Sequence, residues 1–180
     1  MRLPRTFADQ CFVLKRSNYG ESDKILVVFG RRWGKFSAIA KGVRKLTSKK
    51  APHLEPYNLT KLAFASSNFL PIVTQAETIN HFSPDHLDLA AATQAFQLGE
   101  VILELLNEGE NYQAIFDRFR STLDKLDQTD WRDAEAVAET FHRFLLVELG
   151  FGLPQDGVAL VDHLEHLLDR RLRSFRLGQI

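Results

Sequence analysis

Two kinds of hydrophobic pattern divide this chain of 180 residues. In the first 80 residues, apolar side chains form short runs or alternate with polar ones, as they do in half-buried strands. Turns that contain Gly, Asn or Ser separate these runs. The pattern predicts five strands, over residues 11–16, 24–29, 35–41, 59–64 and 69–76. Five short strands with turns at this spacing fit a closed sheet better than a sandwich, so we expect a small barrel.

Beyond residue 82 the apolar residues recur every three or four positions, which indicates amphipathic helices. Ser83-Pro84-Asp85 is typical of a helix start, with a capping hydroxyl, a proline in the first turn and an acid near the positive end of the dipole. Apolar stripes predict four helices, over residues 87–105, 112–126, 130–149 and 156–175. We therefore expect an α+β chain, with a barrel domain over residues 1–80 and an all-α helical domain over residues 81–180.

The net charge of zero hides an uneven distribution. Residues 1–50 contain 13 Lys/Arg and three Asp/Glu, a charge of +10, and the remaining residues carry −10. An asymmetry of this size suggests a polyanion-binding surface on the barrel and an acidic body. The alternative is that these charges only make the protein soluble, although a mixture of positive and negative residues on each surface would serve that purpose better.

The single cysteine and the hydropathy pattern limit the cellular setting. Cys11 excludes both a disulfide within the chain and a four-cysteine zinc site, and its place in a strand predicts a buried, inert thiol. No run of about 18 apolar residues is present, and the first ten residues lack the apolar core of a signal peptide. We expect a soluble, cytoplasmic protein that does not bind membranes.

No set of residues assembles the groups that catalysis needs. His163 and His166 lie one helical turn apart beside Asp162, but two imidazoles make a poor metal site, and surface histidines on an amphipathic helix are the simpler interpretation. Gly150-Phe-Gly152 lacks the third glycine and the preceding strand of a dinucleotide-binding loop. From the sequence we therefore expect a protein that is not an enzyme and that binds neither a cofactor nor a metal.

The basic half interleaves cations with aromatic rings, the residue types that bind phosphates and stack on bases. Residues 31–36, RRWGKF, are the clearest example, and Trp33 is either a stacking platform or a core or turn residue. The segment 41–50 adds a basic loop. A small barrel with these features is typical of nucleic-acid binding, with an anionic protein partner as the alternative.

Several linked motifs over about 70 residues resemble a known family. They are YGESD at residues 19–23, a strand with a basic loop at 34–45, LEP at 54–56 and LPIVTQAETINHF at 70–82. Together they resemble the N-terminal domain of the bacterial recombination mediator RecO. VELGFGLP and LDRRLRSFR, later in the chain, resemble the end of the third helix and the C-terminal helix of that family.

The resemblance implies an OB-fold barrel followed by a helical domain, in a nucleoid-associated protein. It also implies binding of single-stranded and double-stranded DNA, annealing of complementary strands, and help in loading the recombinase RecA onto DNA coated by single-strand-binding protein. RecR and the acidic tail of the single-strand-binding protein are the implied partners, with RecA engaged indirectly. The residues expected to bind DNA are Lys24, Arg31, Arg32, Trp33, Lys35, Lys41, Arg44, Lys45, Lys49 and Lys50.

Four arginines form the only basic cluster of the acidic half. We expect Arg170, Arg171, Arg173 and Arg176 to surround a pocket for the acidic tail, with a favourable interaction at a helix C-terminus as the alternative.

Residues 19–23 are interpreted as architecture that supports the DNA-binding face. Asp23 or Glu21 would accept hydrogen bonds from turn amides or pair with Lys24, and so fix the loop.

The chain departs from the resemblance in one respect. Many members of the family carry a cysteine cluster that forms a zinc module before the last helix, and this chain has no such cysteines, so we expect a compact, metal-free variant. Two other functions stay open. One is an OB-fold RNA-binding protein, which would prefer RNA through 2′-OH contacts. The other is a helical protein-interaction module whose barrel is structural.

Overall fold

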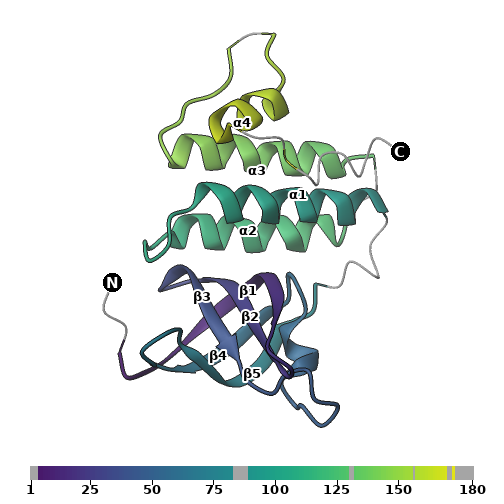
Figure 1. The fold of residues 1–180 in the computed structure, drawn as a ribbon. Helices are drawn as coiled ribbons and strands as arrows, with labels where there is room; N and C mark the ends of the chain where they lie inside the picture. The colour runs from purple at the N-terminus through teal and green to yellow at the C-terminus, as the bar shows by residue number, and fades with distance from the viewer. Residues whose placement is uncertain (1–3, 83–88, 130–131, 156, 170–171, 173–180) are drawn as a thin grey trace. The chain divides into compact units, whose positions relative to one another are not determined.

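The computed structural model describes residues 4–82, 89–129, 132–155, 157–169 and 172 (Figure 1). The strands are β1 (Thr6–Tyr19), β2 (Asp23–Gly30), β3 (Gly34–Ala40), β4 (Leu59–Ala65) and β5 (Ile72–Asn80), with a short 3-10 helix, η1 (Ala51–Leu54), before β4. The helices are α1 (Leu89–Leu105), α2 (Gln113–Leu126), α3 (Ala134–Glu148) and α4 (Leu160–Leu168). The predicted helix start at residues 83–85 lies outside the described residues.

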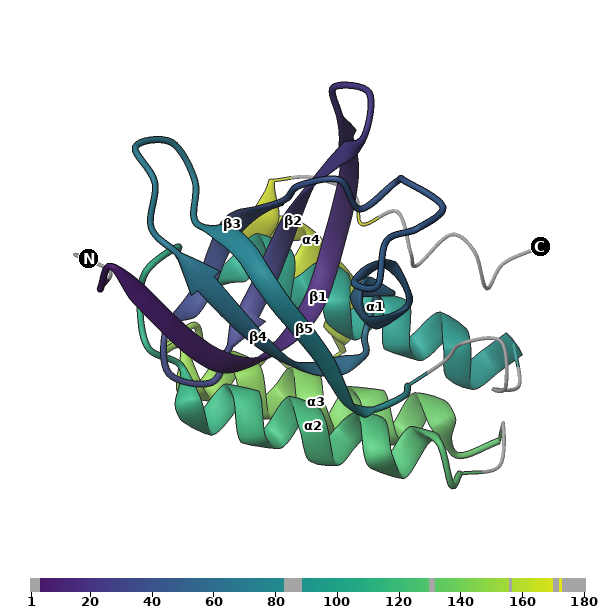
Figure 2. The same ribbon diagram turned by 90° about the horizontal axis from the view of Figure 1, so that it is seen from below.

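The five strands form one closed barrel in the order β1-β2-β3-β5-β4 (Figure 2). Neighbouring strands are antiparallel except for β3 and β5, which run parallel where Ile39 pairs with Ile72. A small five-stranded barrel of this kind is the OB-fold that the resemblance implied, so the predicted α+β fold class is confirmed.

Alternate positions of the strands fill the barrel interior, as the period of two requires. Cys11 is fully buried there, as predicted, and burial raises the pKa of its thiol well above the usual value. The thiol therefore stays protonated at neutral pH and acts as a small apolar side chain. The interior consists of Cys11, Val13, Leu26, Val28, Phe36, Ala38, Ala40, Val43, Leu54, Leu62, Phe64 and Val73.

Two strands differ from the predicted bounds. β1 begins at Thr6 rather than at residue 11, because its first half pairs with β4 and its second half with β2. β5 begins at Ile72, directly after Pro71, rather than containing it. Proline has no N–H for a sheet ladder, but its carbonyl can still take part, and that of Pro71 accepts a hydrogen bond from Ile39 N (2.8 Å).

The chain forms two compact units, which we call the barrel unit and the helical unit. The barrel unit contains residues 1–83 together with 106–116, a segment that comprises the connection from α1 to α2 and the first turn of α2. The helical unit contains residues 84–105 and 117–180. The sequence pattern gave no sign that residues 106–116 group with the barrel.

The 106–116 segment is joined to β3 through its backbone. Gly109 N–H donates a hydrogen bond to Lys35 O (2.9 Å), and Lys35 and Glu108 form a parallel bridge. The approach is closest at Gly34, where a Cβ would lie 1.6 Å from Glu110 O and where φ is +66°. Only glycine fits a left-handed position with a backbone atom so near.

An aromatic cluster completes this docking. The ring of Phe116 lies 5.1 Å from that of Phe12 and 5.4 Å from that of Phe29, measured between centroids. All three side chains are fully buried. The tilted and edge-on arrangements are those that aromatic pairs prefer, so the segment seals the outer face of β1 and β2 where these rings lie.

In the helical unit, α1 packs against α3, and Phe119 of α2 contacts Phe141 of α3 with 5.8 Å between ring centroids. His142, beside Phe141, is also buried, and desolvation lowers the pKa of its imidazole to about 4. Among the residues that the structure describes, no helix is long and apolar enough to cross a membrane.

Replacing Gly34 by alanine should destabilise the barrel more than the same change at Gly20. Both glycines have positive φ, so both variants carry the left-handed penalty of about 1–2 kcal/mol, but a Cβ on Gly20 meets nothing within 4 Å. We expect Gly34→Ala to lower the free energy of unfolding in urea by more than Gly20→Ala, because the 106–116 segment must move away. Equal losses in the two variants would contradict the docking of this segment on β3.

Stability should fall as the pH drops from about 6.5 to 4, in part because of His142. In the unfolded chain the imidazole binds a proton at the ordinary histidine pKa of 6.5, but in the folded chain its pKa is only about 4. Between these values the unfolded state binds more protons, so folding loses up to about 3 kcal/mol at pH 4. His142→Gln cannot titrate, and its free energy of unfolding should fall less over this range. Burial raises the pKa of Asp9 in both proteins, so its contribution cancels in the comparison. Parallel pH profiles would contradict the assignment.

Candidate nucleic-acid interface

Three connections of the barrel leave from the same end, which we call the rim. In the sheet register, Tyr19 pairs with Asp23 and Lys24 with Ala40, which places the end of β3 beside the β1–β2 turn. Ile72, at the start of β5, pairs with both Ile39 and Ala65. The β1–β2 turn, the start of the β3–β4 loop and the β4–β5 loop therefore lie together. In Figure 2 the purple β1–β2 turn and the teal β4–β5 loop project to the same side. Loops at this end of an OB-fold are typical sites of oligonucleotide binding.

The β1–β2 turn is fixed to the basic β3–β4 loop. Asp23 Oδ1 accepts hydrogen bonds from Gly42 N (2.7 Å) and from Ser22 Oγ (3.1 Å). Arg44 N donates to Ser22 O (2.9 Å), and the Arg44 guanidinium donates to Gly20 O (3.1 Å). The hydrogen bond from Gly42 is the main reason that the pKa of Asp23 is lowered. Asp23 thus fixes the loop, as predicted, but its backbone partner is Gly42 of the neighbouring connection and not an amide of its own turn.

Several of the cations predicted from the sequence lie at the rim. Lys41, Arg44, Lys45 and Lys49 are exposed on the β3–β4 loop, and Lys24 is half-buried at the start of β2. These side chains can reach the phosphates of a bound strand.

Lys50 is placed differently from its neighbours in the loop. Its Nζ donates a hydrogen bond to Val73 O (2.9 Å), and burial lowers the pKa of the amine. The side chain therefore holds the basic loop against β5.

Two exposed aromatic rings lie at the rim, and neither was among the residues predicted to bind DNA. Tyr19 is 45% exposed at the end of β1, and Phe69 is 70% exposed in the β4–β5 loop. Ser67 Oγ accepts a hydrogen bond from Phe69 N (3.3 Å) and donates one to Leu70 O (2.7 Å), so this turn holds its shape while presenting an apolar ring to solvent. An aromatic residue inside a polar turn, as in SNYGES and SSNFLP, was the available signal.

Trp33 and Lys35 are less available than the sequence suggested. Trp33 is half-buried and packs against the barrel core, with its ring 5.4 Å from that of Phe7. This arrangement favours the core alternative for Trp33. Lys35 is only 8% exposed, so it is poorly placed to meet a phosphate.

Arg31 and Arg32 lie in the β2–β3 turn, at the end of the barrel opposite the rim. They line a surface hollow of about 270 Å³, which we call the turn hollow. Arg32 is exposed and Arg31 half-buried. The residues that line the hollow are Ala8, Asp9, Gln10, Arg31, Arg32 and Lys61.

The four arginines predicted to bind an acidic tail, at 170, 171, 173 and 176, lie outside the described residues. The helical unit has a second hollow, of about 290 Å³, which we call the helical hollow. Its lining residues are Arg118, Thr122, Lys125, Asp133, Ala136, Val137 and Thr140. The guanidinium of Arg118 lies 5.5 Å from the ring centroid of Phe144, in a cation–π arrangement.

His163 and His166 lie on α4. Within the described ranges, no group of three or more His, Cys, Asp or Glu side chains is placed to hold a metal ion.

Comparison with known proteins matches both halves of the chain to one family. The family described as "Recombination protein O N terminal" matches residues 1–82, and "Recombination protein O C terminal" matches residues 86–172. The chain is 30% identical to "DNA repair protein RecO" of Dehalococcoides mccartyi over 84% of its own length and 59% of that protein. It is 30% identical to the protein of that name from Aliivibrio salmonicida, over 80% and 59% of the two chains. For Heliobacterium modesticaldum the identity is 37%, over 54% and 36%. The chain thus spans about a third to three fifths of the length of these relatives.

Proposed function

The chain belongs to the recombination protein O (RecO) family, and on that premise we propose that it acts in DNA repair and recombination by binding single-stranded DNA at the rim of its barrel. The proposed role is that of a mediator and not of an enzyme. It includes binding of double-stranded DNA, annealing of complementary strands, and help in loading RecA onto DNA coated by single-strand-binding protein.

The gathering of cations and exposed rings at one end of the barrel is the observation that carries the proposal. Single-strand binding combines a basic groove that follows the phosphates with rings on which bases stack. The rim offers both, because closure of the barrel brings Tyr19 and Phe69 to the end from which the basic loop departs. Stacking is worth about 1–3 kcal/mol per base and depends little on sequence, as a mediator that works on any strand requires.

Replacing Phe69 and replacing loop lysines should change DNA binding in different ways. Five cations at the rim predict a log–log salt slope of about −3.5 for single strands, at about −0.7 per phosphate. Lys45→Gln with Lys49→Gln should reduce affinity and flatten this slope by about 1.4. Phe69→Ser should weaken binding by about 1–3 kcal/mol and leave the slope unchanged. Fluorescence anisotropy with a labelled oligonucleotide over a salt series measures both quantities.

Two controls sharpen this experiment. Trp33→Phe keeps a ring in the core and should leave the slope and affinity near the wild-type values. Repeating the titration with an RNA strand at matched salt tests the RNA-binding alternative, which predicts tighter binding of RNA. If the Phe69 variant and the lysine variant both bind DNA with wild-type affinity and wild-type salt slope, the rim is not the DNA-binding site. Absence of any polynucleotide binding by the wild-type protein would favour the protein-interaction module.

We further propose that the acidic tail of the single-strand-binding protein binds the helical hollow, and that RecR is a second partner. The hollow places Arg118 and Lys125 beside the short apolar side chains of Ala136 and Val137, a combination that suits a peptide with both acidic and apolar residues. Asp133 is the acidic residue in its lining, and it would disfavour an acidic peptide that passes close to it.

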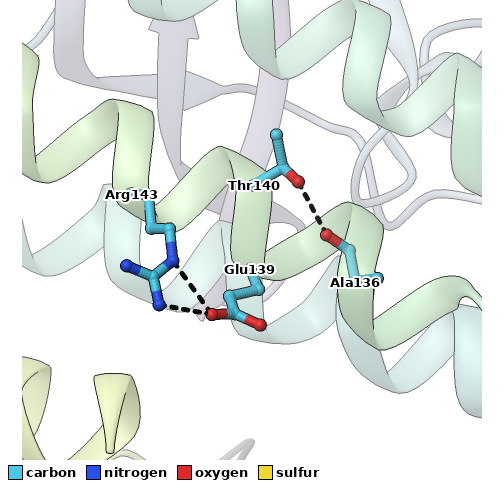
Figure 3. A network of polar contacts seen from close by, with 4 residues as sticks. All are labelled: Ala136, Glu139, Thr140 and Arg143. Carbon is cyan, nitrogen blue, oxygen red and sulfur yellow. Dashed lines mark hydrogen bonds and ion pairs between the residues drawn. The ribbon is translucent and has the colours of Figure 1, made fainter. Parts of the chain in front are cut away.

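Charge removal at the helical hollow should weaken binding of an acidic tail peptide and spare DNA binding. We expect Arg118→Gln with Lys125→Gln to raise the Kd of the peptide, measured by calorimetry. Arg120→Gln with Arg143→Gln is the matched control, because both side chains already pair with an acid one turn away on their own helix. The pair of Arg143 with Glu139 is seen in Figure 3. If Arg171→Gln with Arg173→Gln weakens the peptide and the hollow variant does not, the tail binds at the C-terminal arginines that the sequence predicted.

A further inference from the structure

The turn hollow is a second basic site, built by different residues from those of the rim. Arg31, Arg32 and Lys61 supply three cations around one concave surface. Glu77 lies opposite Lys61 on β5, and Asp9 also lines the hollow, so the net positive charge is lower than three. We therefore expect this hollow to contact few phosphates, and to bind them more weakly than the rim does.

The turn that carries the two arginines is held by a buried carboxylate. Asp9 is 6% exposed, and it accepts hydrogen bonds from Arg32 N (2.9 Å), Trp33 N (3.1 Å) and Gln10 N (2.9 Å). A Cβ on Gly30 would lie 2.5 Å from Asp9 Oδ2, so the strand must pass close to this carboxylate. The backbone of the turn that lines the hollow is thus held in place by Asp9.

The β2–β3 turn, which carries Arg31 and Arg32, is separated from the β1–β2 turn at the rim by the length of β2, whereas Lys61 lies nearer to the rim, four residues before Ala65 on β4. Lys24 pairs with Ala40 at the rim, and Gly30 pairs with Gly34 at the other end. The eight residues of β2 span about 23 Å at about 3.3 Å per residue. This distance exceeds two Debye lengths of about 8 Å at physiological salt, so phosphates bound by the two arginines are largely screened from phosphates bound at the β1–β2 turn.

An acidic segment lies along β3 between the two ends. The Glu108 carboxylate accepts a hydrogen bond from Ser37 Oγ (3.2 Å), and the backbone of Glu108 pairs with that of Lys35 in a β-bridge. The backbone of Glu110 lies against Gly34. A phosphate backbone that crossed the outer face of β3 would meet the carboxylate of Glu108. The rim and the turn hollow are therefore two sites and not two ends of one path over this face.

We propose that the turn hollow binds the phosphate backbone of a second DNA strand while the rim holds the first. This inference rests on the proposed function and adds to it the place of the second strand. Annealing requires two polyanions on one protein, and their repulsion is lowest when they approach through separate basic sites. The barrel would hold one strand by its bases and phosphates and the other by phosphates alone, which leaves the bases of the second strand free to pair.

Two variants of equal net charge test the proposal. The hollow variant is Arg32→Gln with Lys61→Gln, and the rim variant is Lys45→Gln with Lys49→Gln. All four side chains are exposed, and the hydrogen bond from residue 32 to Asp9 uses the backbone, so both proteins should fold, as melting curves would verify. The probe is an oligothymidine of about six nucleotides, within the site sizes of single OB-folds. Stoichiometry comes from titration at low salt, and annealing from fluorescence transfer between complementary strands.

We expect the wild-type protein to bind two oligonucleotides, the second with a salt slope of about −1.4, as for two phosphates. The hollow variant should bind one, with a first Kd within about twofold of the wild-type value because distant sites act independently. The annealing rate of the hollow variant should fall by the same factor as its affinity for the second strand. The rim variant should lose affinity for the first strand.

Four results would overturn the proposal. If the wild type binds one oligonucleotide and both variants weaken it alike, one strand spans both sites and the proposed function stands. If the hollow variant still binds two and anneals normally, the hollow is not the second site. If polyglutamate binds the wild type but not the hollow variant while DNA stoichiometry stays at one, the hollow binds an acidic protein. If the wild type binds no DNA, the proposed function fails as well.

Discussion

The parallel pairing of β3 with β5 is the constraint on which the rest of the barrel depends. Ile39 lies beside Ile72, and the hydrogen bond from Ile39 N to Pro71 O joins the two strands where they meet. This pairing closes the sheet, because the other four strand pairs alone would leave β3 and β5 as edges. Closure also decides which connections become neighbours. It brings the β4–β5 loop to the end where the β1–β2 turn and the basic loop already lie, and leaves the β2–β3 turn at the other end.

Two carboxylates hold the loops at these two ends, by the same kind of contact but in different surroundings. Asp23 accepts the N–H of Gly42 at the rim, and Asp9 accepts the N–H groups of Arg32 and Trp33 at the turn hollow. For Asp23 the hydrogen bond dominates and the pKa is lowered. For Asp9 burial dominates and the pKa is raised, in spite of its three hydrogen bonds. Each acid thus holds the backbone of a loop that carries basic side chains. These hydrogen bonds give a structural reason for the presence of Asp9 and Asp23 in a segment that is otherwise strongly basic.

The connection between α1 and α2 belongs physically to the barrel. Phe116 covers Phe12 and Phe29, which the period of two in β1 and β2 turns away from the interior. Gly34 allows the backbone at Glu110 to pass where any side chain would block it. The same segment brings Glu108 to the outer face of β3. One piece of chain therefore buries apolar surface and also places an acidic side chain on the outer face of β3.

Local structure and family membership could both be predicted from the amino-acid sequence. Periods of two and of three to four residues gave five strands and four helices, and the linked motifs gave the OB-fold and RecO membership, because these signals depend on residues close together in the chain. The sequence also indicated that Asp23 fixes a loop, but not that its partner is Gly42, 19 residues away. It could not show that β1 starts at Thr6, since residues 6–10 are ordered by pairing with β4, more than 50 residues away. The tertiary structure alone decided that Trp33 packs on Phe7 and that Tyr19 and Phe69 share a rim. It alone split the cations of residues 24–50 between two ends. These features depend on closure of the barrel. Closure decides which side chains face the interior and which loops share an end, and it acts through contacts between residues far apart in the chain.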